Sequence, residues 1–223
     1  VQGVEGNAPI INHPDVKRML MQMRALTEAG RAMSFFTIAA EDRSHRHSDA
    51  DQRARDAMLV EVMTPLVKGW GTEVAMESTS LGVQVQGGMG FIEETGAAQH
   101  MRDARILPIY EGTNGIQALD FVGRKCLRDG GETISLLLAA MQQTASELSA
   151  ANGAIGELST ALSNTVEHCQ QALDYVLANS AKSPSLAYNF LMLFGNSVSC
   201  WVLGKVAAAA QKRIDQGSRY LFE

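Results

Sequence analysis

Apolar residues recur every three or four positions over most of this chain, which is the spacing of an amphipathic helix. The first such stripe predicts a helix over residues 15–41. A second pattern predicts a long helix over residues 54–85, with a kink at Pro65. The charged segment between them, residues 41–53, has no apolar period and predicts an exposed connection.

Shorter helices are expected over residues 93–107 and from just after Gly112 to about residue 127. The turn Asp129-Gly130-Gly131 then favours an internal boundary. Beyond it, three further apolar stripes predict a helical hairpin or bundle, and no alternating pattern typical of a strand stands out. We therefore predict an all-α protein with two helical domains, residues 1–128 and 132–223.

Charge and cysteine content narrow the class of protein. The 24 acidic and 19 basic residues give a net charge of −5, which argues against a protein that binds nucleic acid or an anionic membrane. The three cysteines have no C-x-x-C spacing, which is typical of reduced thiols. No signal-peptide pattern opens the chain, and the uncharged stretch 183–204 contains Ser, Asn, Tyr and Pro, so neither secretion nor a membrane span is expected. We expect a cytoplasmic protein.

One stretch that interrupts the helical pattern is rich in glycine. Residues 84–91 contain Gly87, Gly88 and Gly90, and glycines let a backbone approach an anionic ligand closely. The same glycines would also serve as a plain helix C-cap, and taken alone this is the better interpretation.

A second stretch, residues 102–117, places Glu111 just before a predicted helix. In one interpretation, Thr113 or Asn114 caps that helix and Glu111 favours its positive end. In the other, Glu111 is a general base in an apolar cleft, where desolvation tunes its basicity.

Together the two stretches resemble the signature of the acyl-CoA dehydrogenase family: a glycine-rich turn, an Arg-Asp-Ala-Arg helix, then Ile-Tyr-Glu-Gly-Thr and Ile-Gln. The matching residues are Gln84, Gly87, Gly88, Gly90 and Phe91, then 102–105, 109–113, Ile116 and Gln117. The resemblance covers residues 12–128, which correspond to the family's C-terminal, four-helix-bundle-like domain. The added helical tail and the Asn114-Gly115 pair resemble the family's larger bacterial subclass, which has an extra C-terminal helical domain.

This resemblance implies a catalytic role for Glu111, at the position of the glutamate that removes the α-proton of an acyl-CoA thioester. A hydride then passes from the β-carbon to FAD, which supplies the redox chemistry. Tyr110 would border the acyl pocket. An acyl-CoA oxidase with the same motif, or a non-catalytic helical scaffold or oligomerisation module that kept the signature, are the alternatives.

The cofactor-binding residues implied by the resemblance form two groups. Gly112, Thr113 and Asn114 match positions that contact the flavin. Gln84, Gly87 and Gly88 match a turn that receives the adenine-nucleotide part of FAD from a neighbouring subunit. That contact would make the enzyme a homodimer or a higher homo-oligomer.

The family also has an N-terminal helical domain and a central β-barrel domain, and the sequence contains neither. The chain is therefore interpreted as the C-terminal portion of a longer protein, which alone would bind FAD weakly or not at all and would be inactive. The partners implied are an acyl-CoA substrate and an electron-transferring flavoprotein. No metal is expected, because the alternating His45 and His47 in a charged segment are typical of solvated residues. The tail carries no identifiable chemistry and is expected to have a structural or oligomerisation role; the alternative is that it covers the acyl or CoA entrance and tunes chain-length preference.

Overall fold

The computed structural model describes residues 8–149 and 153–217, and every regular element in those ranges is helical. The α-helices are α1 (Pro14–Arg46), α2 (Ala50–Val85), α3 (Gly88–Phe91), α4 (Ala97–Ala104), α5 (Asn114–Arg124), α6 (Glu132–Leu148), α7 (Ala154–Ala178) and α8 (Ser183–Asp215). Short 3-10 turns lie at Ile10–Asn12, Glu93–Thr95, Leu127–Asp129 and Ser180–Lys182. The prediction of an all-α fold is confirmed.

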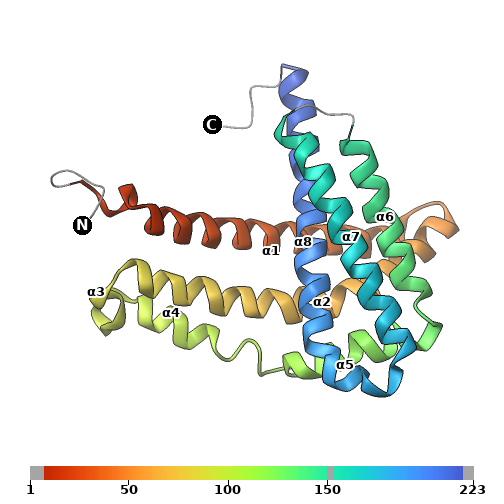
Figure 1. The fold of residues 1–223 in the computed structure, drawn as a ribbon, viewed down its shortest axis with the longest axis horizontal. Helices are drawn as coiled ribbons and strands as arrows, with labels where there is room; N and C mark the ends of the chain where they lie inside the picture. Colours follow the sequence, from red (N-terminus) through yellow and green to blue (C-terminus); the bar gives the residue numbers. More distant parts are fainter. Residues whose placement is uncertain (1–7, 150–152, 218–223) are drawn as a thin grey trace.

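Helices α1 and α2 form a long antiparallel hairpin, and α4 returns along the end of α2 (Figure 1). Helices α6, α7 and α8 stand across this hairpin. Pro14 occupies the first turn of α1, where its missing N–H costs nothing. The helix α2 continues without a break through Pro65 and ends at Val85, where the sequence places its end.

The predicted exposed connection over residues 41–53 is wrong for most of its length. Helix α1 continues to Arg46 and α2 begins at Ala50. Asp49 caps α2 by accepting a hydrogen bond from the Asp51 N–H at 3.0 Å. The charged residues that interrupt the apolar period stabilise the end of α1, because basic residues in its last turn interact favourably with the negative end of the helix dipole.

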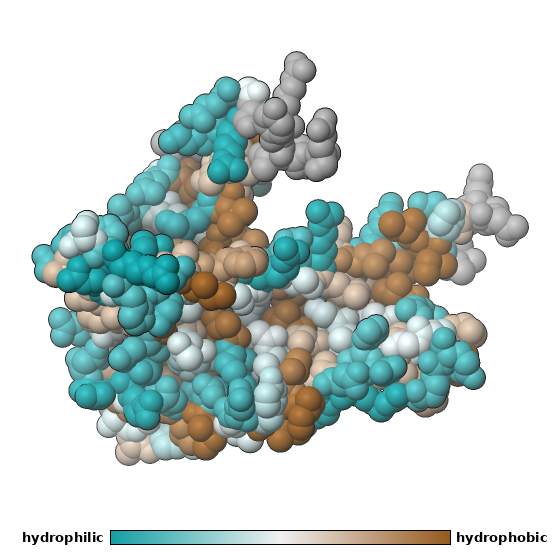
Figure 2. Space-filling model, turned by 180° about the vertical axis from the view of Figure 1, so that it is seen from behind, coloured by the Kyte–Doolittle hydropathy of each residue, from teal (hydrophilic) through white to brown (hydrophobic). Residues whose placement is uncertain are grey.

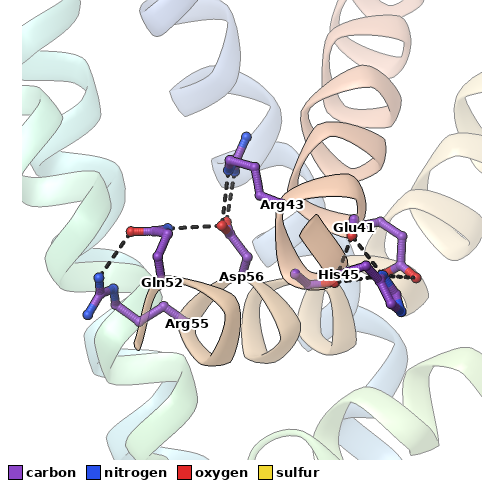
Figure 3. A network of polar contacts seen from close by, with 7 residues as sticks. Glu41, Arg43, His45, Gln52, Arg55 and Asp56 are labelled. Atoms are coloured by element: carbon purple, nitrogen blue, oxygen red, sulfur yellow. Dashed lines mark hydrogen bonds and ion pairs between the residues drawn. The ribbon is translucent and has the colours of Figure 1, made fainter. Parts of the chain in front are cut away.

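One ion pair fastens the two helices near the hairpin connection (Figure 3). Arg43 donates two hydrogen bonds to Asp56, at 2.8 and 3.0 Å, and Gln52 donates a third at 2.9 Å. The Asp56 side chain is 3% exposed, whereas that of Arg43 is 42% exposed. The Arg43 guanidinium holds the pKa of Asp56 below its usual range, against the opposing effect of burial.

The helix predicted over residues 93–107 is shorter in the structure. Gly96 adopts a left-handed φ of 76° and separates the turn Glu93–Thr95 from α4. The α-helix then ends at Ala104, before the turns that lead to Pro108. Helix α5 likewise ends at Arg124, three residues before the predicted end.

The three stripes of the tail form α6, α7 and α8, as predicted. The tail shares one hydrophobic core with the first part of the chain, to which α1, α2, α5, α6, α7 and α8 all contribute. One close approach joins α8 to α2: a Cβ built on Gly195 would lie 2.5 Å from Trp70 ring atoms. Trp70 also donates a hydrogen bond to the Asn196 side chain at 2.7 Å.

Within the described ranges, the segment Ser180–Asp215 is long and apolar enough to span a membrane by length and composition alone. Its most apolar window is 56% buried inside the protein, as expected for a core helix.

Exposed hydrophobic side chains gather along the arm formed by the first part of α1 (Figure 2). Ile10 and Ile11 of the preceding turn and Met21 of α1 are each more than half exposed there, and the exposed Phe35 and Ile38 lie further along α1.

Candidate functional site

The turn that carries Glu111 has an uncommon backbone conformation. Among the described residues other than glycine, Glu111 alone has a positive φ, at 52°, and Gly112 follows at 85°. A side chain held in this region costs about 1 kcal/mol or more, and such residues persist where the surroundings determine them. The Glu111 and Tyr110 side chains are exposed in this chain, and the Tyr110 side chain is 47% exposed. The apolar cleft predicted around Glu111 is therefore not formed by the described residues alone.

Asn114 fixes the end of this turn to α2. Its side chain is 4% exposed, and its amide donates to the Gly69 carbonyl at 3.1 Å and to Glu73 at 2.8 Å. Its oxygen accepts from Thr72 at 3.0 Å, and its backbone N–H donates to the Pro108 carbonyl at 3.0 Å. The side-chain amide is thus engaged within the protein. The contact of Asn114 with flavin that the family resemblance implies stays a prediction.

Lys68 of α2 reaches the same turn. Its ammonium donates to the Gly112 carbonyl at 2.7 Å and to the Asn114 side-chain oxygen at 3.1 Å. Burial lowers the pKa of Lys68, while the neighbouring carboxylates of Glu111 and Glu73 raise it in part. The lysine is thus a half-buried cation that contacts the turn at the residue after Glu111.

Helix α8 borders this network. Tyr188 lies beside Glu73. Burial raises the pKa of the tyrosine, and the Glu73 carboxylate raises it further. The tail therefore reaches the polar groups that hold the Glu111 turn.

Thr113 begins α5 as its N-cap, accepting a hydrogen bond from the Ile116 N–H at 3.3 Å. This confirms the capping interpretation for Thr113, although it leaves the role of Glu111 open. An open cavity of about 400 Å³ lies beside this cap, and its lining includes Arg105, Ile109, Thr113 and Gly115.

The glycine-rich turn lies at the far end of α2. Gly87 adopts a φ of 59°, which favours glycine, and a Cβ on Gly90 would lie 2.3 Å from the Val83 carbonyl oxygen. Gln84, Gly87 and Gly88 are exposed. Gln84 follows Lys68 by sixteen residues on the same helix, or roughly 24 Å at 1.5 Å per residue. The structure does not bring the two predicted groups of cofactor residues together within this chain.

Sequence reasoning missed the α2 side of the site, formed by Lys68, Thr72 and Glu73. The signal was available, because these polar residues interrupt the apolar pattern of the helix at a spacing of four and five. In residues 8–149 and 153–217, no three His, Cys, Asp or Glu side chains come together as possible metal ligands.

Two family models match the chain in series. The model for "Acyl-CoA dehydrogenase, C-terminal domain" matches residues 2–126, and the model for "Acetyl-CoA dehydrogenase C-terminal like" matches residues 137–221.

Two curated relatives match almost the whole chain. A 3-methylmercaptopropionyl-CoA dehydrogenase from Ruegeria pomeroyi is 47% identical over 96% of the chain, and the match covers 38% of that protein. The broad-specificity linear acyl-CoA dehydrogenase FadE5 from Mycobacterium tuberculosis is 32% identical over 94% of the chain, and the match covers 36% of that protein. The chain thus spans a little over a third of the length of these relatives.

Solved structures share the fold. Caenorhabditis elegans ACDH-11, in complex with C11-CoA, matches 95% of the chain with a TM-score of 0.72 at 22% identity, and the match covers 36% of that structure. An acyl-CoA dehydrogenase complexed with FAD from Bacillus anthracis matches 97% of the chain with a TM-score of 0.68 at 23% identity, and the match covers 39% of it. The sequence signature around Glu111, the helical fold and the family-model match over more than half of the chain agree, and the chain belongs to the acyl-CoA dehydrogenase family.

Proposed function

We propose that the protein to which this chain belongs is an FAD-dependent acyl-CoA dehydrogenase and that Glu111 is its base. The observation that carries the proposal is the exposed Glu111 carboxylate, held on a left-handed turn by contacts from α2. A carboxylate presented in this way can accept the α-proton of a thioester placed against it. The FAD would accept the hydride from the β-carbon.

The residues beside the turn fit such a cofactor. Arg105, Thr113 and the Gly115 backbone line the cavity of about 400 Å³ and offer hydrogen-bond donors. A flavin carries carbonyl oxygens and ring nitrogens that accept hydrogen bonds. We propose that Gly112 and Thr113 contact the flavin and that Tyr110, half exposed in this chain, borders the acyl group.

The glycine-rich turn fits a separate part of the cofactor. It lies roughly 24 Å along α2 from Lys68, which binds the Glu111 turn, and such a separation suits a contact with the FAD of another subunit. We therefore propose a homo-oligomer, in which Gln84, Gly87 and Gly88 approach the adenine-nucleotide part. We also propose a cytoplasmic location and an electron-transferring flavoprotein as the electron acceptor. Sedimentation of the whole protein tests the oligomer, and a monomer that retains FAD and activity would contradict it.

The test of the base uses the whole protein with FAD bound and oxygen removed. A panel of acyl-CoAs, including 3-methylmercaptopropionyl-CoA and linear acyl-CoAs of increasing length, is added while the flavin absorbance is followed. We expect one class of substrate to bleach the flavin, and Glu111→Gln to slow the bleaching by about 10²- to 10⁴-fold, because the amide cannot take up the proton.

Glu94→Gln is the control, because Glu94 is an exposed glutamate in the separate turn Glu93–Thr95. Bleaching at the wild-type rate in Glu111→Gln would move the base elsewhere. Rapid reoxidation of the reduced flavin by O₂ would instead indicate an oxidase. Failure to bind FAD or to respond to any acyl-CoA would favour the non-catalytic scaffold.

A further inference from the structure

The Glu111 turn has an uncommon conformation, and the contacts that impose it come from α2. The Gly112 carbonyl belongs to the residue that follows Glu111, so a hydrogen bond to it restricts the backbone of the turn next to Glu111. Lys68 binds that carbonyl at 2.7 Å, the shorter of its two contacts with the turn region.

The Lys68 ammonium also brings charge to the site. The carboxylates that act on it are those of Glu111, from the turn, and Glu73, from α2. Glu73 already accepts a hydrogen bond from Asn114 and lies beside Tyr188 of α8. These contacts place Lys68 within the polar network that holds the Glu111 turn to α2.

We propose that Lys68 is a positioning residue for the reaction, which holds the Glu111–Gly112 turn through its hydrogen bond to the Gly112 carbonyl. This inference rests on the proposed function, in which Glu111 is the base. Lys68 acts through the turn and does not itself contact the reacting atoms.

Lys125 provides a matched control. It is also a largely buried lysine that links the region of α5 to α2, through an ion pair with Glu61 at 2.9 Å. It lies beyond the opposite end of α5 from Glu111. Removing its charge tests the general effect of losing a lysine between these helices.

The experiment compares Lys68→Met, Lys68→Gln, Lys68→Arg and Lys125→Met in the whole protein with FAD, measuring kcat, KM and the thermal midpoint with the best acyl-CoA. In both neutral variants at Lys68 we expect kcat to fall about 10- to 100-fold with little change in KM, because a misplaced base impairs the chemical step more than substrate binding. Lys68→Arg should recover much of the loss, since a guanidinium can donate to the same carbonyl and keeps the charge. Lys125→Met should keep the wild-type kcat.

Wild-type kcat in a folded neutral variant at Lys68 would overturn the proposal, and so would an equal loss of kcat in Lys125→Met. Loss of folding in both neutral variants would assign Lys68 to stability and would overturn it too. Glu111→Gln, measured alongside, separates the two hypotheses. If Glu111→Gln is inactive while Lys68→Met is fully active, only the positioning role of Lys68 fails. If Glu111→Gln is fully active, the proposed base itself is wrong.

Discussion

At the scale of single residues, the site depends on one buried amide. Asn114 joins the end of the Glu111 turn to four positions of α2, at Lys68, Gly69, Thr72 and Glu73. The sequence places Asn114 at a predicted helix start. Its hydrogen-bond partners could not be predicted, because they lie more than forty positions earlier in the chain.

Replacing Asn114 by Ala should lower the free energy of unfolding by about 1–3 kcal/mol, because buried partners on α2 lose their hydrogen bonds. Chemical denaturation of the protein measures this change. Asn179→Ala is the control, since the Asn179 side chain makes a local bond to the Tyr175 carbonyl at the end of α7. Equal losses in the two variants would show that the Asn114 contacts contribute little.

At the scale of elements, the hairpin of α1 and α2 shows what periodicity can and cannot predict. The apolar stripes predicted both helices and the end of α2 at Val85. The connection was predicted too long, because residues 41–53 are charged and a period of apolar residues cannot reveal helix there. The contact that joins the two helix ends is the ion pair between Arg43 and Asp56. A contact between residues of two different helices leaves no periodic pattern in the sequence, so it could not be predicted.

Asp56→Asn should destabilise the hairpin by about 1.5–2 kcal/mol at neutral pH, the lower part of the range for charged hydrogen bonds, because Arg43 is partly solvated and can recover water. Its pH dependence follows from the lowered pKa of Asp56. A lowered folded-state pKa contributes stability above the unfolded value of about 4, and this contribution is lost as the pH falls through the folded value. Between about pH 5 and pH 3 the wild type should therefore lose more stability than the variant, as measured by thermal midpoints.

Glu93→Gln is the matched control for Asp56→Asn. Glu93 also accepts two hydrogen bonds from an arginine, Arg102, but both side chains are more than half exposed. Solvent screens such a pair, and the thermal midpoint should hardly change. A larger effect for Glu93→Gln than for Asp56→Asn would show that burial does not set the strength of these pairs.

At the scale of the whole molecule, the two predicted parts of the chain meet in a common core. The sequence predicted three tail helices, but it gave no indication of where they pack. That depends on complementary shapes such as the close approach of Gly195 to Trp70. A glycine inside a helix is a weak sequence signal until the facing side chain is known.

Gly195→Ala should therefore destabilise the protein by about 1–3 kcal/mol, because the added methyl group would force α8 away from α2. Gly204→Ala on the same helix is the control. A Cβ there would meet Leu148 at an ordinary 3.5 Å, so alanine should be neutral or stabilising by up to about 1 kcal/mol. Denaturant midpoints of the two variants check the contrast, and similar values would contradict the close packing of α8 on Trp70.

The placement of the two tryptophans gives the protein its own optical probe. Trp70 of α2 faces α8, while Trp201 of α8 packs edge-on against Phe36 of α1 and donates a hydrogen bond to Thr144 of α6. Release of the tail from the hairpin would bring water to both indoles and shift their emission to longer wavelength, whereas opening of α3 and α4 would leave both spectra unchanged. The intrinsic fluorescence of the unlabelled protein therefore reports on the docking of the tail.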